Sequence, residues 1–380
     1  MRESGLVVEV ASINPADRSR ADLPTVEAAE ADATFYVKSG GKFMLGFTVL
    51  ALAVRNPGVT VRGLRAALGL GGLDLKARAF ALFYLAEALL VGNWYRRNSL
   101  QHLHAHFGGP VATVAMLTGA AWQIPWSVTL HGPDEFFDQD AFYLRSKIES
   151  ASFVICISDF CRSQVLRVSP STKETHLEVV RLGVDCDVLR PRIAGTRPTG
   201  PVRIVCTGRM VAAKGHRILL EAAAVLAASR IEFSLVLIGD GPERKSLEAQ
   251  SVEQGIAAHV RFLGAMAHQA TLAEVADADL FVLASFAEGL PVALMEAMAL
   301  GVPCVSTIIA AIPELIIDGQ NGLLVPASNV ELLAKALERL ALDPVLRGRL
   351  GSAARETVIA QYNLALNLDQ LAETWKDRLC

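Results

Sequence analysis

The chain has 380 residues, of which 52% are hydrophobic and 20% charged, a composition typical of a globular protein and not of a disordered one. Its formal net charge of −3 gives no electrostatic case for binding nucleic acid. The six cysteines are scattered without a C-x-x-C pair, which argues against a disulfide framework or a zinc site and indicates a reducing compartment. The short apolar run after Met1 is interrupted by Glu9, so we expect no signal peptide and a cytoplasmic protein.

The first half of the chain alternates short apolar runs with longer helical patterns. We expect a helical region over 42–97 and further helices beginning near 110, 144 and 159. The expected strands are "LVVEVASI" (6–13), "HLHAHF" (102–107), "WSVTLHG" (126–132), "FVICIS" (153–158) and "LEVVRLGV" (177–184). Such alternation predicts β-α-β units around a parallel sheet, and apolar strands indicate a sheet covered on both faces.

The pattern pauses at "DCDVLRPRIAGTRPTGP", a proline- and glycine-rich stretch typical of a linker, and then restarts. The second half predicts strands near 202–208, 234–241, 260–264, 279–285 and 303–307, again with helices between them. The expected fold is α/β, with two doubly wound parallel-sheet domains, residues 1–190 and 201–360, facing a cleft. Residues 191–200 would be the linker, and a C-terminal helix over 361–380 would return to the first domain.

Two loops at expected strand ends of the second half carry the first site candidates. "TGRMVAAKG" places Arg209 and Lys214 beside a helix N-terminus, an arrangement that suits an anion such as a diphosphate. A solvated loop with two ordinary cations would have the same sequence pattern. "LIGDGP" contains Gly239, which permits a tight turn and close backbone approach, although an ordinary strand-to-helix turn would look alike.

The stretch "FAEGLPVALMEAMALGVPCV" carries two carboxylates, Glu288 and Glu296, in an otherwise apolar run. Pro291 suits the first turn of a helix, so the N–H groups of Gly289, Leu290 and Val292 would be free to bind a phosphate or sugar hydroxyls. Glu296 would lie among apolar residues, where a carboxylate needs hydrogen-bond donors such as a ribose diol. The alternative is a core glutamate paired with an arginine or a backbone group. With the cation loop, the two carboxylates indicate a nucleotide-sugar.

The order and context of these motifs resemble the second domain of retaining glycosyltransferases of the GT-B fold, family 4. The resemblance rests on "TGRM", "GDGPER", "FAEGLPVALMEAMALGVPCVST" and "IPELIIDGQNGLLVPASN". It extends upstream through "LHAHFGGPVATVAMLTGAAWQIPWSVTLHGPDEF", "ICISDFCRSQV" and "RLGVDCDVLRP", so that it covers roughly 103–329.

The resemblance implies a role for each motif residue of the second half. Arg209 and Lys214 would contact the donor diphosphate and stabilise the charge that grows on the leaving nucleotide. Glu288 would accept hydrogen bonds from the transferred sugar, and Glu296 would bind the ribose. The remaining donor-binding positions would be Gly208, Gly239, Gly289, Leu290 and Val292.

In the first half, the resemblance places His131 of "LHG" near the sugar and the acceptor, with Asp134 as nearby support. Of His104 and His106, one would point inward and one toward the cleft, without the sequence deciding which, and His106 is kept as a candidate site residue. No carboxylate is obviously placed as a double-displacement nucleophile. The resemblance implies that the diphosphate departs and the acceptor attacks on the same face, with retention of configuration. Closure of the two halves would exclude water.

No cofactor is expected apart from the nucleotide-sugar co-substrate, and no metal. The D-x-D patterns at Asp138, Asp185 and Asp277 match a pattern that other glycosyltransferases use for a divalent ion. Two cations at the diphosphate make a metal unnecessary, so we interpret these patterns as coincidental.

The sequence departs from the family pattern in two places. The chain begins almost at the family's second strand, so its first domain would lack the first β-α unit. The run "TIIAAIPEL" has Ala310 and Ala311 where the family often has glycine. The first departure leaves open a truncated, inactive relative that binds nucleotide-sugar. A nucleotide-sugar epimerase of the same architecture is the other alternative.

The resemblance implies a hexosyltransferase of exopolysaccharide or lipid-linked oligosaccharide biosynthesis. Its partners would be a UDP- or GDP-sugar donor and a glycan or lipid-linked oligosaccharide acceptor, without nucleic acid. The mean hydropathy is +0.36, and the run "FMLGFTVLALAV" from Phe43 is too short to span a bilayer. This run reads as a core helix or as an interfacial one, and the second reading places the protein peripherally at the inner face of the cell membrane.

Overall fold

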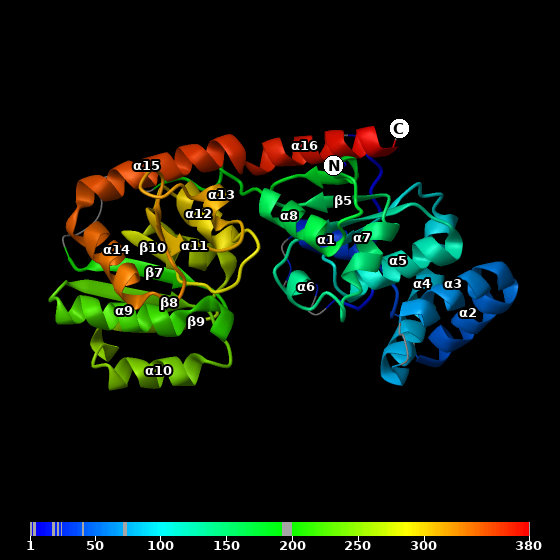
Figure 1. Ribbon diagram of the computed structural model, residues 1–380, viewed down its shortest axis with the longest axis horizontal. Coiled ribbons are helices and arrows are strands. Elements are labelled where there is room, and N and C mark those ends of the chain that lie inside the picture. The colour runs from blue at the N-terminus through cyan, green and yellow to red at the C-terminus, as the bar shows by residue number, and fades with distance from the viewer. Residues whose placement is uncertain are drawn as a thin grey trace. The chain divides into compact units, whose positions relative to one another are not determined.

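The computed structural model describes residues 2, 5–16, 20, 23, 25–39, 42–70, 74–191 and 200–379 (Figure 1). It describes only the backbone of residues 26, 42, 43 and 134. The linker expected over 191–200 therefore lies almost wholly outside the described residues. The chain divides into two compact units: unit 1 comprises Met1–Ile157, Arg162–Val179 and Asp369–Cys380, and unit 2 comprises Ser158–Cys161 and Val180–Leu368.

Unit 1 is built on a four-stranded parallel sheet of order β3-β4-β5-β6. Its strands are β3 (Leu103–His106), β4 (Trp126–Leu130), β5 (Phe153–Cys156) and β6 (Leu177–Val179). The helices that follow them are α5 (Pro110–Trp122), α6 (Asp134–Phe137), α7 (Leu144–Ser150) and α8 (Asp159–Val168). Every residue of β4 and β5 is buried, as expected for a parallel sheet with both faces covered.

Outer helices enlarge unit 1 on one side of α5. They are α2 (Lys42–Arg55), α3 (Pro57–Leu70) and α4 (Leu75–Arg97), and α1 (Thr25–Ala33) precedes them in the chain. α3 and α4 pack on α5 and on each other, and α2 is the outermost layer of this side, in blue in Figure 1. Asp74 begins α4 by accepting a hydrogen bond from the N–H group of Lys76.

The prediction of a strand over residues 6–13 is wrong. Only β1 (Ala11–Ser12) forms, and it pairs with β2 (Phe35–Tyr36) in a separate two-stranded sheet. Residues 5–10 alternate between exposed and half-buried positions. The interior of a parallel sheet needs burial on both faces, which this alternating segment cannot provide.

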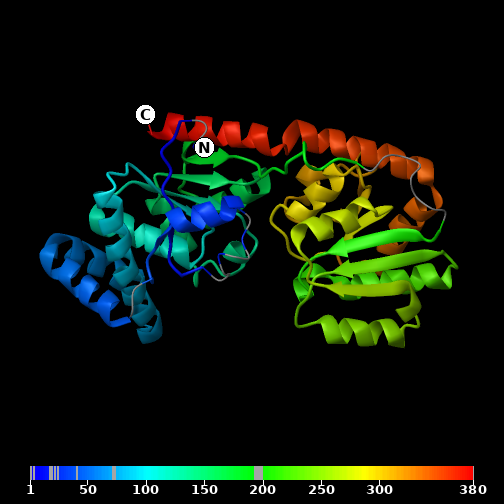
Figure 2. The same ribbon diagram turned by 180° about the vertical axis from the view of Figure 1, so that it is seen from behind.

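Unit 2 contains a six-stranded parallel sheet of order β12-β11-β10-β7-β8-β9 (Figure 2). The strands are β7 (Val202–Thr207), β8 (Phe233–Ile238), β9 (Val260–Gly264), β10 (Leu280–Leu283), β11 (Cys304–Thr307) and β12 (Leu323–Val325). The chain runs outward from β7 through β9 and then restarts on the other side at β10. The order therefore reverses between β7 and β10, and a doubly wound sheet binds its ligand beyond the carboxyl ends of the strands at such a point.

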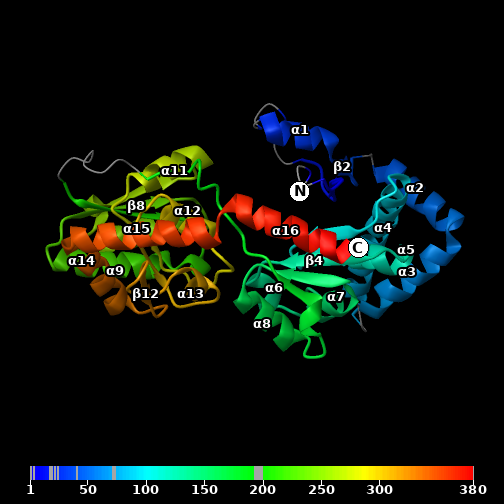
Figure 3. The same ribbon diagram turned by 90° about the horizontal axis from the view of Figure 1, so that it is seen from above.

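Helices cover both faces of this sheet (Figure 3). α9 and α14 pack together on one face, and α12 and α15 pack together on the other. The helices are α9 (His216–Ala228), α10 (Arg244–Glu253), α11 (His268–Ala276), α12 (Val292–Ala299), α13 (Ile312–Leu315), α14 (Val330–Leu342), α15 (Pro344–Gln361) and α16 (Leu364–Leu379). The end of α16 belongs to unit 1, where the ring of Trp375 contacts the edge of Phe153 at a centroid distance of 5.2 Å.

Among the described residues, no single helix is long and apolar enough to cross a membrane. One bent pair, Met44–Arg55 with Pro57–Leu70, passes by length and composition at an angle of 110°.

Candidate functional site

In unit 2, the loops after β7 and β10 meet at the point where the strand order reverses. The N–H group of Phe286 donates to the carbonyl oxygen of Ala213 at 2.8 Å. A Cβ atom at Gly215 would lie 2.0 Å from the carbonyl oxygen of Ala284, and Gly215 has a φ of +64°. Only glycine fits this close approach, so the "KG" pair holds the cation loop against the end of β10.

A second glycine contact joins this loop to the end of β8. A Cβ atom at Gly239, whose φ is +136°, would lie 2.0 Å from the carbonyl oxygen of Gly208. The N–H group of Gly208 donates to Ile238 at 2.9 Å. Gly208 and Gly239, which were both predicted to bind the donor, therefore lie at the carboxyl edge of the sheet.

Lys214 and Glu288 contact each other across the two loops. Lys214 Nζ lies 2.7 Å from Glu288 Oε1, and the Ser285 hydroxyl donates to the same oxygen at 2.6 Å. The Glu288 side chain is only 8% exposed, so the lysine and the hydroxyl stabilise a carboxylate that burial would otherwise disfavour. Among the described residues Glu288 Oε2 has no partner, which leaves it available to a sugar hydroxyl.

The rest of this edge offers cation and N–H donors. Arg209 is exposed, and no described residue pairs with its guanidinium group. α12 begins at Val292 with Pro291 as its N-cap, within one residue of the predicted start. Within the described chain, the N–H groups of Gly289, Leu290 and Val292 have no hydrogen-bond acceptor.

Glu296 lies one turn into α12 and is paired with a histidine, not with the arginine that the core alternative named. His268 Nε2 lies 2.8 Å from Glu296 Oε1, and the exposed fractions of the two side chains are 67% and 16%. Burial raises the pKa of Glu296, and a positive charge on His268 opposes that rise. The carboxylate is thus half-satisfied by a solvent-facing donor that a ligand could displace.

The carboxyl edge of unit 1 carries histidines. His104 points inward, where its ring nitrogens contact the hydroxyls of Ser127 at 2.8 Å and Thr129 at 2.9 Å. His106 points outward, with Nδ1 3.4 Å from His131 Nε2. Burial, together with His106, lowers the pKa of His131 to about 4, so its imidazole is neutral at pH 7. The side chain of Asp134 lies outside the described part of the chain.

Four polar residues at the two edges were not predicted from the sequence: Ser285, His268, Glu135 and Lys147. Ser285 could have been found, because it ends a predicted strand three residues before Glu288. The other three reach their partners from helices, and helical spacing alone gave no signal for them.

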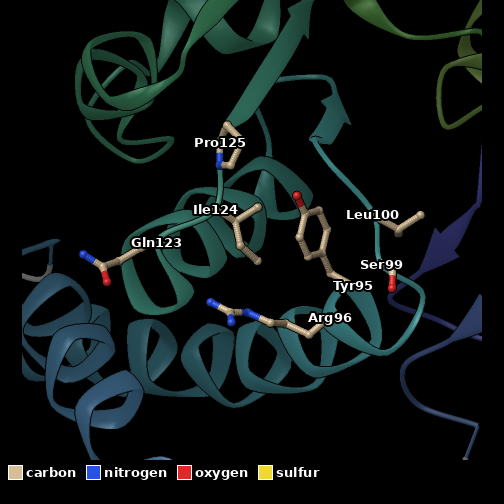
Figure 4. Close-up of a pocket in the computed structure, with 7 residues that line it drawn as sticks. All are labelled: Tyr95, Arg96, Ser99, Leu100, Gln123, Ile124 and Pro125. Atoms are coloured by element: carbon tan, nitrogen blue, oxygen red, sulfur yellow. The ribbon is translucent and has the colours of Figure 1, made fainter. Parts of the chain in front are cut away.

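Two further features lie away from these edges. A cavity of about 290 Å³ in unit 1 is lined by Tyr95, Arg96 and Gln123 among others, and it lies before the starts of β3 and β4, at the amino edge of the sheet (Figure 4). Asp279 of the "DAD" pattern accepts a hydrogen bond from the N–H group of Arg203 at 2.8 Å, at the amino edge of unit 2. Across the described residues, no group of three or more His, Cys, Asp or Glu side chains could hold a metal ion.

Comparisons with known proteins cover both units. Residues 45–188 match the family model "Glycosyltransferase Family 4", and residues 192–357 match "Glycosyl transferases group 1". The chain is 27% identical to the alpha-D-kanosaminyltransferase of Streptomyces kanamyceticus over 73% of this chain and 76% of that protein. It is 30% identical to a GDP-mannose-dependent alpha-(1-6)-phosphatidylinositol monomannoside mannosyltransferase of Mycobacterium tuberculosis, over 58% of this chain and 60% of that one.

Solved structures show the same architecture. The sucrose-phosphate synthase of Thermosynechococcus elongatus superimposes with a TM-score of 0.70 at 21% identity over 77% of each chain. Anabaena HepE in complex with UDP-glucose superimposes with a TM-score of 0.68 at 21% identity, over 77% of this chain and 82% of that one. The two parallel sheets confirm the predicted GT-B fold. The chain belongs to glycosyltransferase family 4, the group 1 glycosyl transferases, which take a sugar from a nucleotide-sugar donor.

Proposed function

We propose that the protein is a retaining hexosyltransferase that moves a hexose from a UDP- or GDP-sugar to a glycan or a lipid-linked oligosaccharide without a metal ion. The observation that carries the proposal is the meeting of Lys214, Glu288 and Ser285 where the strand order of unit 2 reverses. Similar proteins support this donor class, because the Mycobacterium tuberculosis mannosyltransferase is GDP-mannose-dependent and Anabaena HepE is solved with UDP-glucose.

The two cations would act on the leaving group. Arg209 is exposed and free to form a bidentate contact with a diphosphate, and Lys214 is held at its loop by Glu288. As the glycosidic bond breaks, negative charge grows on the diphosphate, and fixed cations stabilise that charge more than they stabilise the bound donor. The same cations make a divalent ion unnecessary.

The two carboxylates would orient the donor. Glu296 would accept hydrogen bonds from the ribose hydroxyls in place of, or together with, His268. Glu288 would accept from the hexose through Oε2, since Oε1 is occupied by Lys214 and Ser285. Loss of either carboxylate would therefore weaken donor use through different contacts.

The test is a product assay on the full chain with UDP-glucose, UDP-galactose, UDP-N-acetylglucosamine and GDP-mannose, each with and without EDTA. Mass spectrometry would detect glycosylated acceptors in a membrane glycolipid extract, and NMR would read the anomeric configuration of the product. We expect one donor to give an EDTA-insensitive product with retained configuration. Inversion, or activity abolished by EDTA and restored by a divalent ion, would contradict the proposal.

We also propose that the protein lies peripherally at a membrane, and the outer face of α2 supports this. This helix buries Leu52 in the core of unit 1, yet its opposite face exposes four large apolar side chains. They are Met44 at 71%, Phe47 at 74%, Leu50 at 63% and Val54 at 72% exposed. A helix that is apolar on both faces needs a second apolar environment.

Charge favours lipid over a second protein copy at this face. Residues 42–70 contain Lys42, Arg55, Arg62 and Arg65 and no acidic residue, which complements an anionic headgroup layer and repels a second copy. We expect the protein to sediment with phosphatidylglycerol vesicles at low salt. Phe47→Asp should weaken this binding by about tenfold or more, whereas Val345→Asp on α15 should not. Wild-type protein that stays in the supernatant, or a dimer that Phe47→Asp dissociates, would contradict the lipid contact.

A further inference from the structure

Phe107 is the most unusual residue at the carboxyl edge of unit 1. It follows β3 with a φ of +65°, a left-handed conformation that is rare for a bulky side chain. Its side chain is 57% exposed. The ring stacks on the imidazole of His131 with a centroid distance of 4.1 Å and an interplanar angle of 26°. One ring face is thus covered by His131, and the residue stays largely open to solvent.

A buried carboxylate holds the two loops that carry this ring pair. Glu135 is only 5% exposed, and its Oε1 accepts a hydrogen bond from the N–H group of Gly108, next to Phe107. Its Oε2 accepts from the N–H groups of His131 at 3.1 Å and Gly132 at 3.0 Å. A single carboxylate therefore joins the loop after β3 to the loop after β4.

A buried lysine holds the same loop from the other side. Lys147 of α7 is fully buried, and its Nζ donates to the carbonyl oxygens of Gly108 at 2.6 Å and Gly109 at 2.9 Å. Burial lowers the pKa of Lys147 to about 7, and the nearby Glu135 carboxylate opposes that shift. Buried charges are costly, and packed apolar side chains would often serve stability as well or better. What these two charges provide is the geometry of the Phe107 and His131 loops.

We propose that Phe107 and His131 form a platform that binds a hexopyranose ring of the acceptor, and that Glu135 and Lys147 are positioning residues that hold this platform. The inference rests on the proposed glycosyl transfer. A hexopyranose has an apolar C–H face that packs on an aromatic ring, and a hydroxyl edge that bonds polar groups. Phe107 offers the first contact through the ring face that His131 leaves open, and His131 supports that ring from the covered face.

The platform is tested by saturation-transfer NMR on the full chain saturated with UDP. The probes are methyl α-glycosides of glucose, galactose, mannose and N-acetylglucosamine. We expect signal from at least one glycoside, a loss of about tenfold or more in its affinity in Phe107→Ala, and retention in Phe107→Trp. Phe137→Ala, which removes a 76% exposed phenylalanine of the same unit, is the matched control and should change nothing.

The positioning role has its own spectroscopic readout. Stacking on Phe107 shifts the ring protons of His131 upfield, and we expect that shift to disappear in Phe107→Ala and to shrink in Glu135→Gln and Lys147→Met. An unchanged His131 shift in both folded variants would overturn the positioning role. If either variant fails to fold, the surface variants of Phe107 still decide the platform.

Failure of the platform is distinguishable from failure of glycosyl transfer. UDP that raises the melting temperature while no glycoside gives saturation transfer, or while Phe107→Ala binds as wild type, would overturn the platform alone. No melting shift with UDP or GDP would instead remove the proposed function on which the platform rests.

Discussion

The carboxyl edges of the two sheets use charge in opposite ways. In unit 2 the charged groups line the edge itself: Arg209 is exposed, and Lys214 pairs with Glu288 where a ligand would arrive. In unit 1 the edge presents neutral rings, whereas the charges of Glu135 and Lys147 are buried beneath them. One fold therefore supplies a charged edge suited to an anionic diphosphate and a neutral edge suited to an uncharged sugar.

The two edges also differ in what their charged groups contact. In unit 2, Lys214 and His268 contact other side chains, each of which a ligand could take over. In unit 1, Glu135 and Lys147 contact backbone N–H and carbonyl groups, which no ligand can replace without moving the loops. The charged groups at the unit 2 edge are accessible to a ligand, whereas those at the unit 1 edge hold the loops in place.

Among the substitutions that test this difference between the edges, we expect Lys214→Met to have the largest effect on activity. Loss of the cation should lower kcat by about 100- to 1,000-fold, because charge on the leaving diphosphate loses a fixed stabilising group. It also leaves the buried Glu288 carboxylate with Ser285 as its remaining partner. Steady-state kinetics with the identified donor would measure the loss. The control is Lys214→Met combined with Glu288→Gln, which should recover stability without recovering kcat.

At the unit 1 edge, we expect the buried Lys147 to make the stability of the protein depend on pH. The pKa of Lys147 is about 7 in the folded protein, below its ordinary value, so the unfolded chain binds more protons between pH 7 and 10. Stability from this group should therefore rise with pH across that window, by about 3 kcal/mol.

Urea unfolding at several pH values would measure that rise as the difference between wild type and Lys147→Met. The difference removes the contribution of the buried cysteines, such as Cys206, whose pKa burial raises to about 12. If the free energy of unfolding changes with pH in the same way in both proteins, the pKa of Lys147 is not lowered by folding. That result would contradict the difference between the two edges.

A smaller effect is expected when the ribose contact is removed. Glu296→Ala should weaken donor binding by about tenfold to 100-fold, the worth of a hydrogen bond to a charged group. His268→Ala is the matched control, because it removes the partner of Glu296 and keeps the carboxylate. Calorimetric titration with UDP would measure both, and equal losses in the two variants would assign the binding role to the pair and not to Glu296.

The smallest predicted effect concerns a departure from the family pattern in unit 2. Ala310 has a φ of +46°, a conformation that costs a residue with a Cβ atom free energy that glycine does not lose. Ala310→Gly should raise stability by about 0.5 kcal/mol. Ala311→Gly should lower stability, because Ala311 is fully buried with a φ of −88°. Differential scanning calorimetry would compare the two, and a lower melting temperature for Ala310→Gly would contradict the strain.

The sequence predicts the fold well and brings the right residues to the unit 2 edge, because both depend on patterns that are local in the chain. Apolar strands, their spacing, and the start of α12 beside Pro291 were all visible in short windows. The prediction of a strand over residues 6–13 was wrong, because composition alone does not show whether both faces of a strand are buried. Glu135 and Lys147 were missed because Lys147 reaches a backbone carbonyl 39 positions away, a contact that only the folded topology creates.

We propose above all that the unit 2 edge binds a nucleoside diphosphate through Glu296 and the two cations without a metal. Thermal-shift titration of the full chain with UDP, GDP and ADP, with and without EDTA, tests it most directly, because a ligand of the folded state raises the melting temperature. We predict that one of these nucleotides raises the melting temperature, that EDTA leaves this shift intact and that Glu296→Ala reduces it. A cooperative melt that no nucleotide shifts, or a shift that EDTA abolishes, would contradict it.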